Sequence, residues 1–295
     1  MPANYNELTS RILNPFIFGN IIIAICALVL SLETYQQLQL PLRLDGLAML
    51  IFFATLSLYN VHRLLVVARL QPQDYGVVTA WAAQHRFTLF MLALIGAGGV
   101  AFFVFQTSLL IFGILAVLGA VSLLYELPLI KKTSRFRSLR NLWIHKAFMI
   151  TSVWTLATAF LPAVNAHVPL SDYHLWLVLA ERMLFIFIIA LCFDARDVEF
   201  DSKEGLKTIP ILYGPVFTQH LYKGLSAMLI IMAVIHYVLL LQDYATGLAM
   251  ILSAGITYFV VQRTSSKQSD YYYIFIVDGM MILQFLLIAL LSALF

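Results

Sequence analysis

Nine long apolar stretches divide this sequence and leave few folds open to it. They cover residues 15–33, 44–68, 85–105, 108–125, 142–162, 174–193, 216–241, 245–262 and 272–294. Each meets or approaches the ~20 residues that an α-helix needs to cross the hydrocarbon of a bilayer. Backbone polar groups must be satisfied inside lipid, so such segments cross the membrane as helices. The sequence therefore predicts an all-α polytopic membrane protein with nine transmembrane helices and a single domain, 1–295.

The composition excludes the main soluble classes. Hydrophobic residues make up 62% of the chain and charged residues only 11%, whereas a soluble domain is roughly 25% charged. Cys26 and Cys192 both fall in apolar stretches, so they form neither a disulfide framework nor a zinc motif. The net charge of +3 is too small to indicate a nucleic-acid partner. The partner expected from composition is the lipid bilayer.

The basic residues indicate an orientation. With nine spans, the N-terminus and every second loop share one side, together with all Lys and Arg residues except Arg43 and Arg182. The positive-inside rule places that side in the cytoplasm and the C-terminus on the opposite side. For most of these bases, setting the topology is a sufficient explanation.

Three acidic residues stand at regular spacing beyond the sixth apolar stretch. Asp194, Asp197 and Asp201 lie at positions i, i+3 and i+7, so a continued helix puts them on one face. Three carboxylates repel one another unless a cation lies among them, and Mg²⁺ prefers such oxygen ligands. The alternative is a solvated helix end whose acids pair with Arg196 and Lys203.

Residues suited to phosphate follow this cluster. Gly205 permits a turn, and Lys207 and Thr208 carry groups that can donate hydrogen bonds to phosphate oxygens. The whole segment reads D-x-x-D-x-x-x-D-x-x-x-G-x-x-T-x-P from Asp194 to Pro210.

This pattern resembles the second aspartate-rich motif of the UbiA family of intramembrane prenyltransferases. The sequence Asp-Ala-Arg-Asp-Val-Glu, residues 194–199, is similar to the motif in the branch of this family that prenylates naphthoquinone precursors. The stretch from Tyr125 through Pro128 to Lys131, followed by a basic loop, is similar to another family segment. The resemblance covers roughly the whole chain.

The resemblance implies a fold and a reaction. Nine helices would surround a central cavity, where an isoprenoid diphosphate binds through Mg²⁺ held by two aspartate-rich motifs. The diphosphate leaves, and the allylic cation alkylates an acceptor. Asp194, Asp197 and Asp201 would be the metal ligands, and Lys131, Lys207 and Thr208 would contact the diphosphate. Tyr125 would steady the cation, because an aromatic face attracts positive charge.

The first family motif is degenerate in this chain. The family pattern N-D-x-x-D-x-x-x-D aligns with the stretch that begins at Asn60. Val61, Leu64 and Ala68 occupy the three aspartate positions, and none of them can bind Mg²⁺. The sequence therefore does not support a standard two-motif magnesium site.

Two readings of this loss remain open. In the first, one metal cluster suffices, and Asn60, Arg63, His62 and loop bases contact the diphosphate; arginine suits bidentate phosphate binding. In the second, the protein no longer performs the family reaction. Arg63 also reads as an anchor at the helix end, and His62 as an interfacial residue.

Three further ionisable residues lie inside apolar stretches. Glu181 and Arg182 are adjacent within 174–193, and adjacent residues on a helix do not face each other. Each therefore needs a partner on another helix. Asp278 lies early in 272–294, where it is expected to line the cavity at the cytoplasmic end.

The leading functional prediction is transfer of a prenyl group from a polyprenyl diphosphate to a small acceptor, an aromatic quinone precursor, with Mg²⁺ as cofactor. The alternative is a non-catalytic relative that binds a lipid, a quinone or a partner protein. A small-solute transporter ranks last, because the two halves lack a matched pair of Gly/Pro-broken helices.

Overall fold

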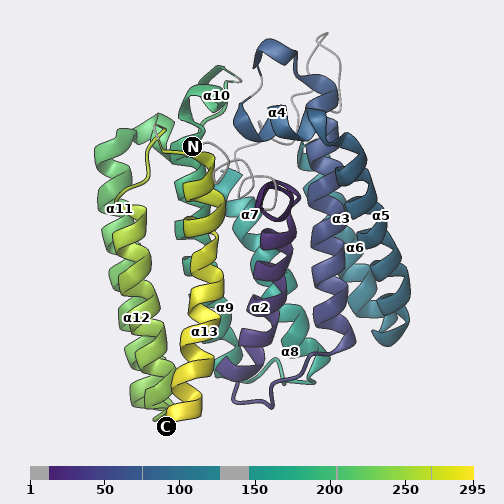
Figure 1. The fold of residues 1–295 in the computed structure, drawn as a ribbon. Helices are drawn as coiled ribbons and strands as arrows, with labels where there is room; N and C mark the ends of the chain where they lie inside the picture. The colour runs from purple at the N-terminus through teal and green to yellow at the C-terminus, as the bar shows by residue number, and fades with distance from the viewer. Residues whose placement is uncertain (1–12, 75, 127–145, 204, 267) are drawn as a thin grey trace, which may run out of the picture.

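A computed structural model describes residues 13–74, 76–126, 146–203, 205–266 and 268–295; the side chains of Asp74 and of residues 124–126 also lie outside the description. Within these ranges the chain is helical and contains no strand. The long helices stand side by side as a bundle (Figure 1).

Within the described ranges, long helices are joined by short turns and short helices. The α-helices are α2 (Ile21–Gln37), α3 (Gly46–Arg69), α4 (Val77–Gln84), α5 (Arg86–Phe103), α6 (Leu109–Glu126), α7 (Lys146–Thr155), α8 (Leu161–Asn165), α9 (Tyr173–Arg196), α10 (Val198–Lys203), α11 (Ile209–Ala233), α12 (Tyr244–Val261) and α13 (Gly279–Leu294). Tight 3-10 turns η1 (Pro72–Asp74) and η2 (Val104–Gln106) and wider π-helical stretches η4 (Leu156–Phe160), η5 (Val234–Leu240) and η6 (Tyr272–Val277) connect or extend them.

These helices lie close to the apolar stretches of the sequence. Among the described residues, seven continuous helical segments are long and apolar enough to cross a membrane, and two shorter apolar helices, Ile21–Gln37 and Leu109–Leu123, fall on the remaining expected stretches. An all-α integral membrane protein is therefore confirmed, whereas the exact count of nine spans stays a prediction. The turn at Thr107 separates the third and fourth stretches, as expected from their short connection.

The first span differs from its expected form because the chain breaks at Gly19 and Asn20. Residues 13–18 are helical, and α2 starts only at Ile21. Asn20 has a φ of 60°, a left-handed conformation that asparagine tolerates better than most residues. The break turns the Gly19 carbonyl oxygen toward α3, where it accepts a hydrogen bond from the Asn60 side chain.

Glycines let α3 and α5 pack closely. A Cβ atom built on Gly96 would lie 2.6 Å from the Ser57 backbone nitrogen, and one on Gly99 would enter the Phe53 ring. Gly98 has open space around it. Two of the three glycines in this patch therefore serve the close packing that small residues allow in membranes.

Opposite ends of the bundle carry different elements. The short helices α4 and α10 lie at one end, whereas α8 and the C-terminus lie at the other (Figure 1). At Gly214, with a φ of 79°, α11 is kinked, and Pro215 follows. The straight part of α11 thus begins close to residue 216, where hydropathy places the start of this span. The end that carries α4 and α10 also carries the predicted acidic cluster.

Candidate active site at the ends of α7, α9 and α10

Three carboxylates converge on one ammonium group. The Lys146 Nζ atom lies 3.6 Å from Asp194 Oδ1, 3.3 Å from Asp197 Oδ2 and 3.2 Å from Asp201 Oδ2. It donates hydrogen bonds to the latter two. The predicted clustering of the three aspartates is confirmed, and the cation among them is the first residue of α7. We call these four residues the aspartate cluster.

The backbone brings the aspartates together without one continuous helix. Asp194 lies in the last turn of α9, and Asp197 caps that helix with its N–H bonded to the Phe193 carbonyl oxygen. The Asp197 carbonyl oxygen then accepts from the Asp201 N–H at 2.8 Å, which sets the first turn of α10. The expected single helical face is thus replaced by two helices with a break at Asp197, and the carboxylates still meet.

A second base adjoins the cluster. The Arg196 Nε atom lies 2.8 Å from Asp197 Oδ1, and Nη1 lies 3.8 Å from Asp270. The guanidinium carbon lies 4.9 Å from the Phe193 ring centre and 5.2 Å from that of Tyr273, within the range of cation–π attraction. These contacts hold the guanidinium next to Asp197.

Charge, more than burial, decides the ionisation of Asp197. Burial opposes the charged form, but the Arg196 guanidinium and the Lys146 ammonium outweigh it and hold the pKa of this carboxyl below its usual value. Asp197 is therefore an anion in neutral solution. Asp278, which is 6% exposed, also interacts electrostatically with Arg196. As predicted, Asp278 lies at this end of the bundle.

Comparison with known proteins decides the family. The model of the UbiA prenyltransferase family matches residues 77–286, more than half of the chain. This chain belongs to the UbiA prenyltransferase family. It is thus related to enzymes of intramembrane prenyl transfer.

A solved structure of digeranylgeranylglyceryl phosphate synthase is similar to this chain over 93% of its residues and 96% of the other chain, with 13% identity and a TM-score of 0.48. No curated protein matches the sequence. The matched UbiA range begins at residue 77, after the degenerate first motif, and it contains the whole aspartate cluster.

The cluster as it stands does not fit the magnesium ion that UbiA enzymes generally use. Its oxygens have the right chemistry, and both Asp194 carboxylate oxygens are buried without a hydrogen-bond partner among the described residues. Mg²⁺, however, needs oxygens at about 2.0–2.1 Å, whereas those around the Lys146 nitrogen lie at 3.2–3.6 Å. Within the described part of the chain, no group of three or more acidic, His or Cys side chains is placed to hold a metal ion.

The predicted diphosphate contacts have unequal support. Thr208, at the N-cap of α11, is 1% exposed, and its hydroxyl has no hydrogen-bond partner among the described residues. Lys207 is exposed. The side chain of Tyr125, at the end of α6, and all of Lys131 lie outside the described residues. The roles assigned to these four residues stay predictions.

Asn60, the one residue kept from the first motif, has a structural role in this protein. Its side-chain nitrogen donates to the Gly19 and Leu56 carbonyl oxygens at 3.1 and 2.8 Å, and its oxygen accepts from Asn20 at 3.2 Å. Asn60 therefore holds the break before α2 against α3. Arg63, one turn further along α3, is half-buried, and diphosphate binding by either residue stays a prediction.

Sequence reasoning missed Lys146 and Arg196 as members of the site. The sequence places Lys146 in the basic stretch that is similar to a family segment and among the bases that set the topology, and it places Arg196 among those bases and as a possible partner of solvated acids. The signal was the charge itself, because three acids in one row require cations. Nothing in the spacing identifies Lys146, which lies more than 45 residues before Asp194.

A second buried polar network lies further along α9. Arg182 donates to Glu33, Gln37 and the Leu30 carbonyl oxygen of α2. The neighbouring Glu181 accepts instead from the Tyr237 hydroxyl of η5. The prediction that each residue of this pair has a partner on another helix is confirmed.

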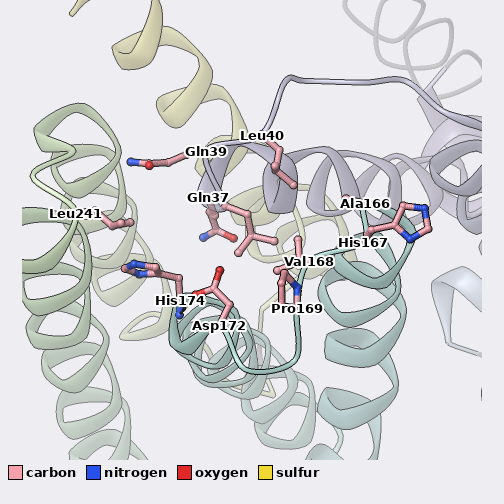
Figure 2. Close-up of a pocket in the computed structure, with 11 residues that line it drawn as sticks. Gln37, Gln39, Leu40, Ala166, His167, Val168, Pro169, Asp172, His174 and Leu241 are labelled. Carbon is pink, nitrogen blue, oxygen red and sulfur yellow. Dashed lines mark hydrogen bonds between the residues drawn. The ribbon is translucent and has the colours of Figure 1, made fainter.

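A pocket of about 250 Å³ adjoins that network. Gln37, Asp172 and His174 lie around it, together with the turn at His167 (Figure 2). His174 is near the start of α9 and Asp194 is near its end, so the rise of the helix puts the pocket ~30 Å from the aspartate cluster. This pocket is therefore separate from the candidate active site.

Proposed function

We propose that this protein transfers a prenyl group from a polyprenyl diphosphate to a small aromatic acceptor, a quinone precursor, within the membrane. The observation that carries the proposal is the convergence of three carboxylates and two bases at the end of α9, in a chain of the UbiA family. The predicted phosphate-binding residues Lys207 and Thr208 follow directly in the sequence.

The reaction makes clear demands on such a site. The bond between the allylic carbon and the diphosphate oxygen breaks, and the electron pair leaves with the diphosphate. A ring carbon of the acceptor then bonds to the allylic carbon and loses a proton. Departure of the diphosphate requires positively charged groups close to its oxygens. The allylic cation that forms must be kept away from water.

The described residues supply part of the positive charge and part of the apolar surroundings that this reaction needs. Lys146 and Arg196 carry the positive charge next to the aspartates, and the core around α7 and α9 is apolar, with Ala147, Leu191 and Tyr222 fully buried. The assay includes Mg²⁺ because UbiA-family prenyltransferases generally use it for diphosphate binding.

The test is product formation by purified protein in lipid nanodiscs. Radiolabelled polyprenyl diphosphates of several chain lengths are incubated with a hydroxynaphthoic acid, a hydroxybenzoic acid or a non-aromatic lipid alcohol, with MgCl₂ or with EDTA. We expect a labelled product with an aromatic acceptor. Labelled product with the lipid alcohol alone would contradict the acceptor class, and diphosphate binding without any product would favour the non-catalytic alternative.

A further inference from the structure

The cation in the aspartate cluster belongs to the protein itself. The Lys146 side chain is 13% exposed, and its partners are 1%, 25% and 0% exposed for Asp194, Asp197 and Asp201. In such a buried setting an ion pair is screened far less than at a surface. The ammonium group is therefore a strong competitor for any other cation that approaches the same oxygens.

The spacing of the oxygens matches an ammonium ion better than a small divalent metal. Two of the contacts are hydrogen bonds, at 3.2 and 3.3 Å, which is at the long end for N–H···O bonds. For Mg²⁺ at the nitrogen position, each carboxylate would have to move inward by more than about 1 Å. Asp194 and Asp201 lie on two different helices, so such a contraction requires their side chains to rotate toward each other or α9 and α10 to shift.

The first motif provides an independent reason for a built-in cation. Val61, Leu64 and Ala68 stand where the family pattern has aspartates. These three positions therefore provide no carboxylate ligand for a second metal. The remaining three carboxylates need at least one cation to coexist in a buried position. Lys146 meets that need without a metal.

We propose that Lys146 is the built-in counter-ion of the aspartate cluster, and that it excludes divalent metal ions from this position in the free protein. The proposal deepens the proposed function, on which it rests for the nature of the site. It assigns to Lys146 a role that the resemblance gives to Mg²⁺. Removing the ammonium while keeping the carboxylates should turn the cluster into a metal site.

Binding of Mn²⁺ alone tests this without any substrate. The wild-type protein in nanodiscs is stripped of metal and titrated with MnCl₂, and free Mn²⁺ is followed by electron paramagnetic resonance. The variant is Lys146→Met, which keeps an unbranched side chain one heavy atom shorter and removes its charge. Lys203→Met is the matched control, because Lys203 is exposed on α10 and its loss changes the net charge by the same amount.

We expect Lys146→Met to bind one Mn²⁺ at least about tenfold more tightly than wild type, since tenfold is a modest share of the cost of an uncompensated buried charge. Lys203→Met and Lys146→Arg should behave as wild type. Equal Mn²⁺ affinity in wild type and Lys146→Met would overturn the proposal, as would an equal gain in Lys203→Met.

A wild-type measurement covers the case in which Lys146→Met does not fold. If the wild type binds one Mn²⁺ at micromolar concentrations and Asp197→Asn abolishes that binding, a metal already holds the cluster and the proposal is wrong. If the wild type binds no such ion, the proposal stands. Neither result depends on prenyl transfer, which is measured by its own product, so the two proposals can fail separately.

Discussion

Arg182 Nη2 lies 3.0 Å from Glu33 Oε1, and both side chains are completely buried inside the bundle. The guanidinium of α9 also donates to Gln37 and to the Leu30 carbonyl oxygen, so α9 and α2 are joined by charge and by hydrogen bonds. A charged pair at this depth is costly unless its partners are all in place. The pair therefore specifies how these two helices pack.

Arg182→Met should destabilise the protein severely. The change leaves the Glu33 carboxylate buried without its cation, and breaking a buried pair from one side costs about 3–5 kcal/mol. The double variant Arg182→Met/Glu33→Leu should recover part of this loss. Unfolding in mixed micelles measures the free energy of each variant, with the exposed Arg86→Met as control; a loss in Arg86→Met equal to that in Arg182→Met would contradict the assignment.

Glu181 provides a second, separable connection, from α9 to η5. Its Oε2 atom accepts from the Tyr237 hydroxyl at 2.8 Å, and Oε1 lies 3.1 Å from His236 Nδ1. Tyr237→Phe removes one donor from a buried carboxylate, which costs ~1–3 kcal/mol. Tyr244→Phe, at an exposed position on α12, should change little. Unfolding in mixed micelles measures the free energy of both variants. Equal stability of Tyr237→Phe and wild type would show that the Glu181 carboxylate does not depend on the hydrogen bond from Tyr237.

Two neighbouring glycines on α5 should respond in opposite ways to alanine. Gly96→Ala places a methyl group 2.6 Å from the Ser57 backbone nitrogen, so α3 and α5 must separate, and such overpacking costs ~1–3 kcal/mol. Gly98→Ala meets open space and should be neutral or stabilising by up to ~1 kcal/mol, the difference in helix propensity. Thermal unfolding of both variants is the measurement; identical melting temperatures would refute the close packing at Gly96.

Asn60→Ala separates a structural role from a phosphate-binding one. The variant loses the bonds to Gly19, Leu56 and Asn20, so the buried carbonyl oxygens lose donors at a cost of ~1–3 kcal/mol. We expect a lower melting temperature without substrate and an unchanged dissociation constant for a polyprenyl diphosphate at a temperature where the variant is folded. A large loss of diphosphate affinity with normal stability would restore the predicted contact role of Asn60.

The sequence predicts what depends on local pattern and misses what depends on helix packing. Hydropathy locates the apolar helices because each is a continuous stretch of sequence whose length reaches or approaches that needed to span a bilayer. The i, i+3, i+7 spacing predicts that the aspartates meet, since they lie within three turns of one another. The pair Lys146–Asp201 and the pair Glu33–Arg182 each join helices that are distant in the sequence. The break at Gly19-Asn20 did have a local signal, because such dipeptides favour turns.

Asp201→Asn should lower prenyl transfer far more than it lowers stability. The amide keeps the shape of a fully buried side chain but removes the charge that holds the Lys146 ammonium at 3.2 Å. The ammonium then loses its shortest carboxylate contact and is held less firmly. Loss of one preorganised electrostatic contact costs about 10²–10³ in kcat. Glu199→Gln, an exposed acid on the same helix α10, is the matched control and should keep full activity. Product formation in nanodiscs and thermal unfolding are measured on both variants. Equal activity of the two variants would show that the aspartate cluster takes no part in the reaction. Parallel loss of activity and stability in Asp201→Asn would show that the cluster has only a structural role.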